Sequence, residues 1–323
     1  MTVDEKGMML DARVIPWPRS VSGQAADALR ASASQPRAVM PDPSDTEGWR
    51  ATIAQVDGAM AAAYTGPVDS SIMVSTEQCA GVGVHRARPE SLSADDQRLY
   101  IEIHGGALVF GAGDFCRACG ARDAALFGVE VAAIDYRMPP DHPFPAALDD
   151  CLAVYAAEVE RRGAHNIIVG GGSAGGNLAA ALMLRARMAG LPMPAALLLL
   201  SPEVDLTESG DSFETLMSID PVLKARLTES IMLYSNGHRL DDPLLSPLFG
   251  DLSGFPPTLL QSGTRDLFLS NTVRMHRRLR QAGVAADLHV FEAMPHGGFF
   301  DGPEDEEKDR EIADFVAAHW ARH

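Results

Sequence analysis

The chain has 323 residues, 46% of them hydrophobic, and carries a formal net charge of −17 at pH 7. This charge would repel a phosphate backbone, which excludes nucleic acid as an expected partner. No apolar run is long enough to cross a bilayer, so we predict no membrane span. The segment Met1–Lys6 lacks the basic and apolar parts of a signal peptide, and we therefore expect a cytoplasmic protein.

The first 70 residues differ from the rest because Pro- and Ser-rich stretches alternate there with two helix-like segments. These segments run near Ser22–Ala33 and Thr46–Tyr64, and apolar residues recur along one helical face of the second. A small helical cap would have this pattern. We expect the insertion at residues 205–240 to complete the cap, which leaves residues 71–204 and 241–323 as the core.

From about residue 71, short continuous apolar runs alternate with helical segments. Such runs are typical of strands that are covered on both faces. The alternation therefore indicates an α/β fold with a mainly parallel sheet flanked by helices. The predicted strands are Val82–Arg86, Leu99–Ile103, Val129–Ile134, Asn166–Val169, Ala195–Leu200, Thr258–Gln261 and Asp287–Phe291. The predicted helices are Cys116–Phe127, Pro145–Arg161, Ala174–Met188, Asn271–Ala282 and Asp305–Trp320.

The chain has four cysteines, and Cys116 and Cys119 form a CxxC at the start of a predicted helix. A structural zinc site would need a second pair or suitably spaced histidines, and none follows in the sequence. A redox CxxC is an alternative interpretation. In a cytoplasmic setting we expect reduced structural thiols.

A glycine-rich turn, His104-Gly105-Gly106-Ala107, follows the predicted strand Leu99–Ile103. Its plain interpretation is a Gly-Gly turn after a strand. Consecutive glycines also let backbone N–H groups face a reacting oxyanion without obstruction by a Cβ atom. The second interpretation gains weight from a motif further along the chain.

That motif is Gly171-Gly172-Ser173-Ala174-Gly175, a Gly-x-Ser-x-Gly between an apolar strand and an Ala-rich helix. A sharp turn from strand to helix exposes the serine and needs small residues beside it. The spacing fits neither of the glycine-rich phosphate-binding patterns. We therefore predict that Ser173 is a nucleophile, with the N–H of Ala174 as one oxyanion donor.

A serine nucleophile needs a base and an acid that orients the base. In this kind of fold the order along the chain is Ser, then Asp or Glu, then His, each on a loop after a strand. Asp266 and His296 fit these places. His276 lies within a predicted helix and His289 within a predicted strand, so they fit less well.

Together these motifs resemble those of the bacterial hormone-sensitive-lipase family of carboxylesterases, which have an α/β-hydrolase fold with a helical cap. The matching segments are His104-Gly105-Gly106, Asp135 to Ala147, Gly171 to Asn177, Asp242 to Pro247 and the segment that begins at His296. The chain departs from the family pattern at Ala107, where a glycine is usual, and at Gly172, where an aspartate is usual.

The resemblance implies a carboxylic ester hydrolase with Ser173, Asp266 and His296 as its triad and Gly106, Ala107 and Ala174 as oxyanion donors. His104 and Gly105 belong to the oxyanion motif. The family needs no metal or cofactor, acts on small-molecule esters of short to medium or apolar chains, and suggests a homodimer. A lactonase, amidase or acyltransferase with the same triad is the alternative, followed by a non-catalytic binding protein of the same fold.

Overall fold

The computed structural model describes residues 2–4, 7–9, 12, 14–64, 70–300 and 302–320. The other positions of the expected cap and core segments lie outside the described residues. A two-stranded antiparallel sheet of β1 (Thr2–Asp4) and β2 (Gly7–Met9) begins the described chain.

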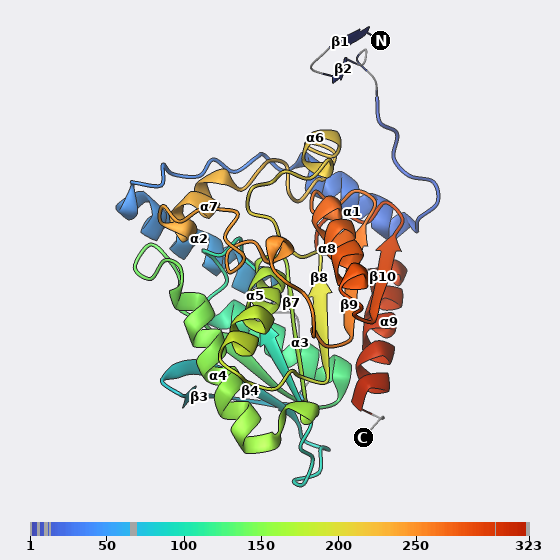
Figure 1. Cartoon of the computed structure of the whole chain (residues 1–323). Helices are drawn as coiled ribbons and strands as arrows, with labels where there is room; N and C mark the ends of the chain where they lie inside the picture. The colour runs from blue at the N-terminus through green and yellow to red at the C-terminus, as the bar shows by residue number, and fades with distance from the viewer. Residues whose placement is uncertain are drawn as a thin grey trace.

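The core is an eight-stranded sheet in the order β10-β9-β8-β7-β5-β6-β4-β3. Only β3 and β4, at one edge, run antiparallel to their neighbours, and the other six strands are parallel (Figure 1). The sheet thus confirms the predicted α/β-hydrolase class. The strands are β3 (Ile72–Cys79), β4 (Val82–Pro89), β5 (Leu99–Ile103), β6 (Glu130–Asp135), β7 (Ile167–Gly172), β8 (Ala196–Leu200), β9 (Thr258–Gly263) and β10 (Ala286–Phe291).

Helices cover both faces of this sheet, because successive side chains of a buried strand point to opposite faces. In β8, Leu197 and Leu199 join one apolar cluster, whereas Ala196 and Leu198 join another. The first cluster includes α4 (Ala146–Arg162), α5 (Ala174–Met188) and α8 (Leu269–Gln281). The second includes α3 (Asp114–Phe127) and α9 (Pro303–Trp320).

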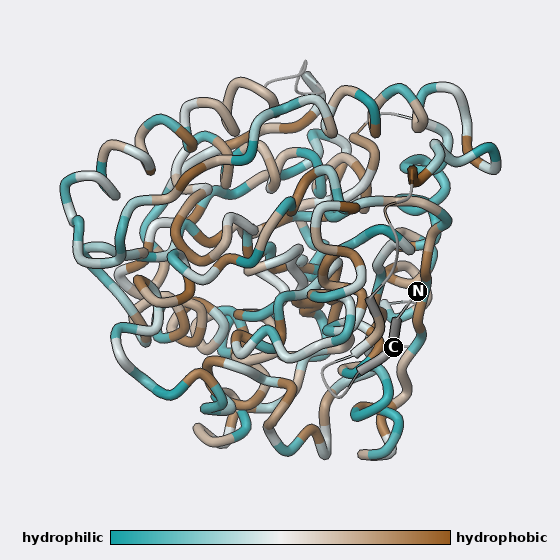
Figure 2. Tube along the Cα trace, turned by 90° about the horizontal axis from the view of Figure 1, so that it is seen from above, coloured by the Kyte–Doolittle hydropathy of each residue, from teal (hydrophilic) through white to brown (hydrophobic). Residues whose placement is uncertain are grey.

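Four further helices lie in the two segments expected to form the cap. They are α1 (Gly23–Ser34), α2 (Thr46–Tyr64), α6 (Ser212–Thr215) and α7 (Thr228–Ser235). All four lie at the same end of the sheet in Figure 1. Two short 3-10 helices, η1 (Ala164–Asn166) and η2 (Pro247–Phe249), complete the elements of the core. Along the outer helices, polar and apolar stretches alternate, as expected for helices with one buried face (Figure 2).

The first of these helices is attached to the last helix of the core. Ser22 is the N-cap of α1, and its hydroxyl accepts a hydrogen bond from Ala25 N–H. The same hydroxyl donates to Glu304 Oε2 at 2.8 Å, and Ser22 N–H donates to Glu304 Oε1. Glu304 lies in the acidic first turn of α9, where negative charge is favourable.

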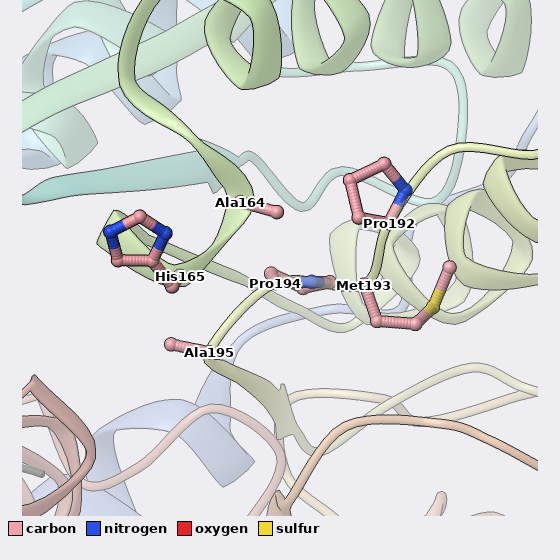
Figure 3. A pocket seen from close by; sticks show the side chains of 6 residues that line it. All are labelled: Ala164, His165, Pro192, Met193, Pro194 and Ala195. Atoms are coloured by element: carbon pink, nitrogen blue, oxygen red, sulfur yellow. The ribbon is translucent and has the colours of Figure 1, made fainter. Parts of the chain in front are cut away.

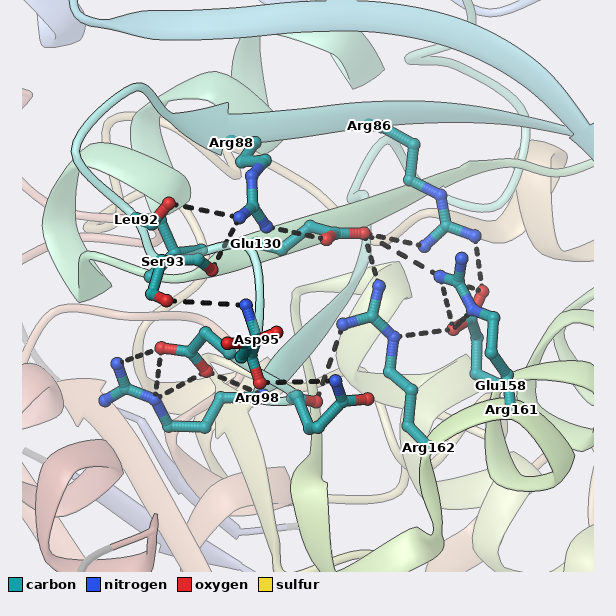
Figure 4. A network of polar contacts seen from close by, with 12 residues as sticks. Arg86, Arg88, Leu92, Ser93, Asp95, Arg98, Glu130, Glu158, Arg161 and Arg162 are labelled. Atoms are coloured by element: carbon teal, nitrogen blue, oxygen red, sulfur yellow. Dashed lines mark hydrogen bonds and ion pairs between the residues drawn. The ribbon is translucent and has the colours of Figure 1, made fainter.

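A network of arginines and glutamates joins the antiparallel edge of the sheet to α4 (Figure 4). Glu158 is 1% exposed and pairs with Arg86, with Arg161 at 2.8 Å and with Arg162 at 3.2 Å. Glu130 contacts Arg162 as well. Although burial raises the pKa of Glu158, the arginines outweigh this effect and hold it below its usual value.

No helix in the described part of the chain is long and apolar enough to cross a membrane. The four cysteines form no disulfide, and Cys116, Cys119 and Cys151 are buried.

Candidate active site

Ser173 stands at the turn between β7 and α5, as the sequence predicted. Its backbone has φ 57° and ψ −120°, a conformation that costs an L residue free energy and is typical of functional turns. Ser173 N–H donates to Leu200 O at 2.8 Å, and Glu203 N–H donates to Ser173 O at 3.1 Å. The turn is thus held from both sides by the end of β8 and the loop after it.

The glycines around this turn are required by space. A Cβ atom added at Gly175 would lie 1.8 Å from Ile103 O, and one added at Gly171 would lie 2.4 Å from the same atom. The start of α5 therefore packs directly on the backbone at the end of β5. At Gly172 an added Cβ atom would lie 3.7 Å from its nearest neighbour, Leu200 O, which is an ordinary contact, so the backbone conformation leaves room for a Cβ atom there.

Ser173, His296 and Asp266 form one continuous chain of hydrogen bonds. Ser173 Oγ lies 2.9 Å from His296 Nε2, and His296 Nδ1 lies 3.0 Å from Asp266 Oδ1. Asp266 follows β9 and His296 follows β10, which are neighbouring parallel strands. A serine hydrogen-bonded to a histidine, which is itself hydrogen-bonded to an aspartate, is an arrangement that can activate the serine hydroxyl as a nucleophile.

The aspartate is buried and fully hydrogen-bonded. Its Oδ1 also accepts from Phe268 N–H at 2.9 Å, and its Oδ2 accepts from Ser262 Oγ at 2.7 Å. Burial raises the pKa of Asp266, but the charge of His296 and these hydrogen bonds outweigh burial and lower it. Burial likewise lowers the pKa of His296, and the charge of Asp266 outweighs it and raises the pKa above its usual value. Asp266 is therefore ionised, and its charge makes the imidazole of His296 a stronger base than an ordinary histidine.

The loop after β5 lies against the serine. A Cβ atom added at Gly105 would lie 3.5 Å from Ser173 Cβ and 3.0 Å from Gly172 O. In the described part of the chain, neither Gly106 nor Ala107 donates its backbone N–H to a protein acceptor. Ala174 opens α5, so its N–H has no acceptor inside the helix. Three unused donors therefore belong to residues around Ser173.

The buried side chain of His104 anchors this loop to the core. Its ring is fully buried and stacks on Tyr136, with ring centroids 4.1 Å apart. Tyr136 Oη donates to His104 O at 2.8 Å, and His104 Nδ1 lies 2.8 Å from Gly105 O. Burial lowers the pKa of His104 to about 4, so the ring is neutral at pH 7. The loop is thus anchored by packing.

Ala107 lies at an apolar cluster that joins this loop to the expected cap. It packs against the apolar cluster of Trp49, Val109 and Phe110, and Trp49 belongs to α2. Ala107 has φ 53°, which is an unusual backbone conformation for alanine. The departure from the family's glycine therefore lies at the cluster through which α2 packs on this loop.

Asp220 is a functional candidate that the sequence analysis did not find. It lies in the expected cap segment, is fully buried and accepts a hydrogen bond from Leu267 N–H at 2.9 Å. Burial and the nearby Asp266 raise the pKa of Asp220 to about 6, although His296 lowers it. No local pattern distinguishes this aspartate from other loop carboxylates, because its site forms only through the fold.

Glu203 was also missed. It is 1% exposed, and among the described residues neither of its carboxylate oxygens has a hydrogen-bond partner. Burial, with Glu208 nearby, raises the pKa of Glu203 well above its usual range, which favours the neutral acid. The residue whose N–H donates to the Ser173 carbonyl oxygen therefore carries a neutral, buried carboxyl group.

A hollow of about 520 Å³ lies elsewhere on the core (Figure 3). Its lining residues precede β7 and β8, whereas Ser173 follows β7. The hollow is therefore at the opposite end of the parallel strands from Ser173, His296 and Asp266. It is lined by Ala164, His165, Pro192, Met193, Pro194 and Ala195.

The sequence of this chain is similar to a known protein family and to named hydrolases. A family model described as the alpha/beta hydrolase fold matches residues 100–300. An esterase of Acinetobacter venetianus is 33% identical over 71% of this chain and 75% of its own length. An acetyl-hydrolase of Streptomyces hygroscopicus is 34% identical over 69% of this chain and 72% of its own length.

Solved structures of an esterase and of a hormone-sensitive lipase also superpose on this chain. A crystallised esterase superposes with a TM-score of 0.88 at 35% identity, covering 98% of this chain and 99% of that one. A hormone-sensitive lipase from a metagenome library superposes with a TM-score of 0.83 at 30% identity, covering 93% of this chain and 99% of that one.

Proposed function

Since this chain belongs to the α/β-hydrolase family, as a serine ester hydrolase of the bacterial hormone-sensitive-lipase type, we propose that Ser173, His296 and Asp266 are its catalytic triad. One observation carries the proposal: Ser173 Oγ is 2.9 Å from His296 Nε2, whose other nitrogen is 3.0 Å from Asp266. Each group thus has the contact that its role requires.

In this mechanism His296 Nε2 accepts the Ser173 proton while Oγ attacks the ester carbonyl. Asp266 keeps the proton on His296 Nδ1 and stabilises the imidazolium that forms. The N–H groups of Gly106, Ala107 and Ala174 stabilise the oxyanion, and loss of one such donor typically costs about 10²–10³ in rate. His296 then protonates the leaving alcohol, and water hydrolyses the acyl-enzyme by the same steps.

Residues 1–70 and 205–240 are proposed to form the cap over this site. Asp220, from the second segment, is hydrogen-bonded to Leu267 beside the catalytic aspartate. The first segment contributes Trp49, which packs on Val109 and Phe110 after the oxyanion loop. Movement of either segment would therefore change the contacts of the loop that carries Asp266 or of the oxyanion loop.

The proposed substrates are esters of short to medium acyl chains or of apolar alcohols. Among relatives, one is named an acetyl-hydrolase, and one similar crystal structure, that of EstE5, was soaked with p-nitrophenyl butyrate. Apolar side chains in the cap segments remain partly exposed, with Trp17 at 41%, Met217 at 40% and Met232 at 44%. Homodimer assembly and a cytoplasmic location stay predictions from the sequence.

The proposal is tested by replacing Ser173 with alanine. The kcat for p-nitrophenyl butyrate is expected to fall about 10⁶-fold, while the circular dichroism spectrum and Tm stay close to wild type. Ser253→Ala, at an exposed loop position, is the matched control and keeps full activity. An organophosphate should add one adduct to the wild type, mapped to Ser173.

Substantial activity in Ser173→Ala, or an adduct on another residue, would refute the assignment. Product analysis with a competing alcohol or amine then separates hydrolysis from acyl transfer. Lactone and amide substrates compared at equal concentration decide between the esterase and its alternatives, since all of them use the same triad.

A further inference from the structure

A second group of reactive side chains lies outside the triad, where α3 meets the antiparallel part of the sheet. It consists of His85 on β4, Cys116 in the first turn of α3 and Asp135 at the end of β6. One potential ligand atom from each residue lies within 4.8 Å of the others. His85 and Cys116 are buried and Asp135 is partly exposed, which leaves one side of the group accessible from solvent.

The imidazole of His85 is oriented for ligation. Its Nδ1 lies 2.9 Å from Thr76 Oγ1, and its Nε2 lies 3.6 Å from Asp135 Oδ2. His85 is 7% exposed, yet among the described residues its Nε2 has no hydrogen-bond partner. A metal-bound histidine typically uses one nitrogen for the metal and fixes the other by a hydrogen bond, which is the arrangement seen here.

The two carboxylate oxygens of Asp135 likewise have different neighbours. Its Oδ1 accepts a hydrogen bond from Gly113 N–H at 3.1 Å, and its Oδ2 faces His85. Burial raises the pKa of Asp135, but the contact with His85 and the Gly113 N–H outweigh burial and lower it. The group is therefore ionised at neutral pH and has one oxygen left for a cation.

The third member supplies sulfur. Cys116 is fully buried, forms no disulfide, and has a thiol pKa that burial raises. A bound cation would displace the thiol proton to solvent, so that one thiolate and one carboxylate balance two positive charges. Thiolate, imidazole and carboxylate form a donor set that zinc binds well, with water at the fourth position.

We propose that His85, Cys116 and Asp135 bind one thiophilic divalent cation of the zinc type. The sequence did not indicate this site, because the three residues are far apart along the chain and Cys119, the partner in the CxxC, does not take part.

A cation at this site would stabilise the contacts that hold the backbone of the oxyanion loop. Asp135 already holds Gly113, at the end of the loop that begins at His104, and Asp57 Oδ1 accepts from Gly111 N–H at 2.7 Å in the same loop. A cation bound here would connect β4, β6 and α3 around these contacts. Its main effect is therefore on stability, and it takes no part in the reaction.

The experiment uses the full chain, freed of metal by dialysis against a chelator. Zinc binding is measured by equilibrium dialysis with elemental analysis, and Cd²⁺ or Co²⁺ titration follows the thiolate-to-metal absorption band. The expected result is one equivalent of zinc, and a Tm that rises by about 5 °C at a hundredfold excess over Kd. Cys116→Ser should lose the band and the rise in Tm.

Cys119→Ser is the matched control because Cys119 lies in the same helix and is also buried, and Cys151→Ser tests the other buried thiol that interacts with Cys116. Both should bind like the wild type. Equal binding by Cys116→Ser and the controls, or no binding by the wild type, would overturn the proposal. If Cys116→Ser does not fold, His85→Gln must weaken zinc binding at least tenfold, and unchanged affinity there would have the same consequence.

Discussion

Replacement of Asp266 by asparagine separates charge from orientation at the triad. In the native site, Oδ1 accepts from His296 Nδ1–H and from Phe268 N–H, whereas Oδ2 accepts only from the Ser262 hydroxyl. A hydroxyl can turn round and accept, but the two N–H groups cannot. The asparagine amide should therefore place its oxygen at Oδ1 and its NH₂ toward Ser262. The histidine tautomer is then preserved, and only the negative charge is lost.

The magnitude follows from that charge. His296 Nδ1 and Asp266 Oδ1 are 3.0 Å apart, and two unit charges about 4 Å apart interact by about 4 kcal/mol at an effective dielectric constant of about 20. Each 1.36 kcal/mol changes a rate tenfold, so we expect kcat/KM to fall about 10³-fold. A wrong tautomer would cost about 10⁴-fold in kcat.

The pH dependence gives a second measurement. In the proposed mechanism the unprotonated form of His296 is the base, so activity should rise with pH through its pKa, which Asp266 raises. Asp266→Asn should therefore move the acidic limb of the kcat/KM profile to lower pH. Asp220→Asn is the control, because Asp220 is a buried carboxyl near His296 without a hydrogen bond to it. It should shift the limb the same way with less than tenfold loss.

Two results would refute this reasoning. A loss of less than tenfold in Asp266→Asn would mean that the charge of Asp266 contributes little to the reaction. An acidic limb that stays in place would mean that Asp266 does not set the pKa of His296. Thermal unfolding of each variant establishes that the rates refer to folded protein.

Two further predictions concern stability. Gly175→Ala should lower the free energy of unfolding by about 3 kcal/mol or more, because the new methyl group would meet Ile103 O. Urea unfolding measures this, with Gly58→Ala in α2 as the control, since a Cβ atom there meets nothing within 4 Å; equal stability of the two variants would contradict the packing. Glu158→Gln should cost about 1.5–3 kcal/mol at pH 7, since Arg86 loses a buried charged partner while it keeps Glu77 and Glu130. Because the folded-state pKa of Glu158 is lowered, its contribution is present above the unfolded pKa and is lost as the pH falls through the folded value, so wild type and variant should converge in acid.

The parallel core and the triad contacts could be expected from local patterns. Ser173, Asp266 and His296 each follow an apolar strand run, and the fold places the ends of parallel strands at one edge. Strand β3 was missed, because of its eight residues only Ile72 is buried and no apolar run marks it. An exposed edge strand is defined by its partner, which a single sequence does not show.

The missed site residues share a different cause. Asp220 and Glu203 are ordinary carboxylates in sequence, and their unusual pKa values arise from burial by segments far along the chain. The group of His85, Cys116 and Asp135 likewise exists only because β4 and β6 pair while α3 packs on them. Spacing along the chain predicts sites within one turn or loop, and these sites are built between elements.

The order of the triad along the chain has a consequence for synthesis. β5 and β7 pair with Ile103 opposite Gly171, although α3, β6 and α4 lie between them in sequence. The loop after β5 and Ser173 thus become neighbours only after a long-range pairing, which loop-closure entropy makes slow. Asp266 and His296 emerge from the ribosome later still. A further 123 residues separate Ser173 from His296. During their synthesis the nascent chain carries the proposed nucleophile without its proposed base, which follows the last strand of the sheet.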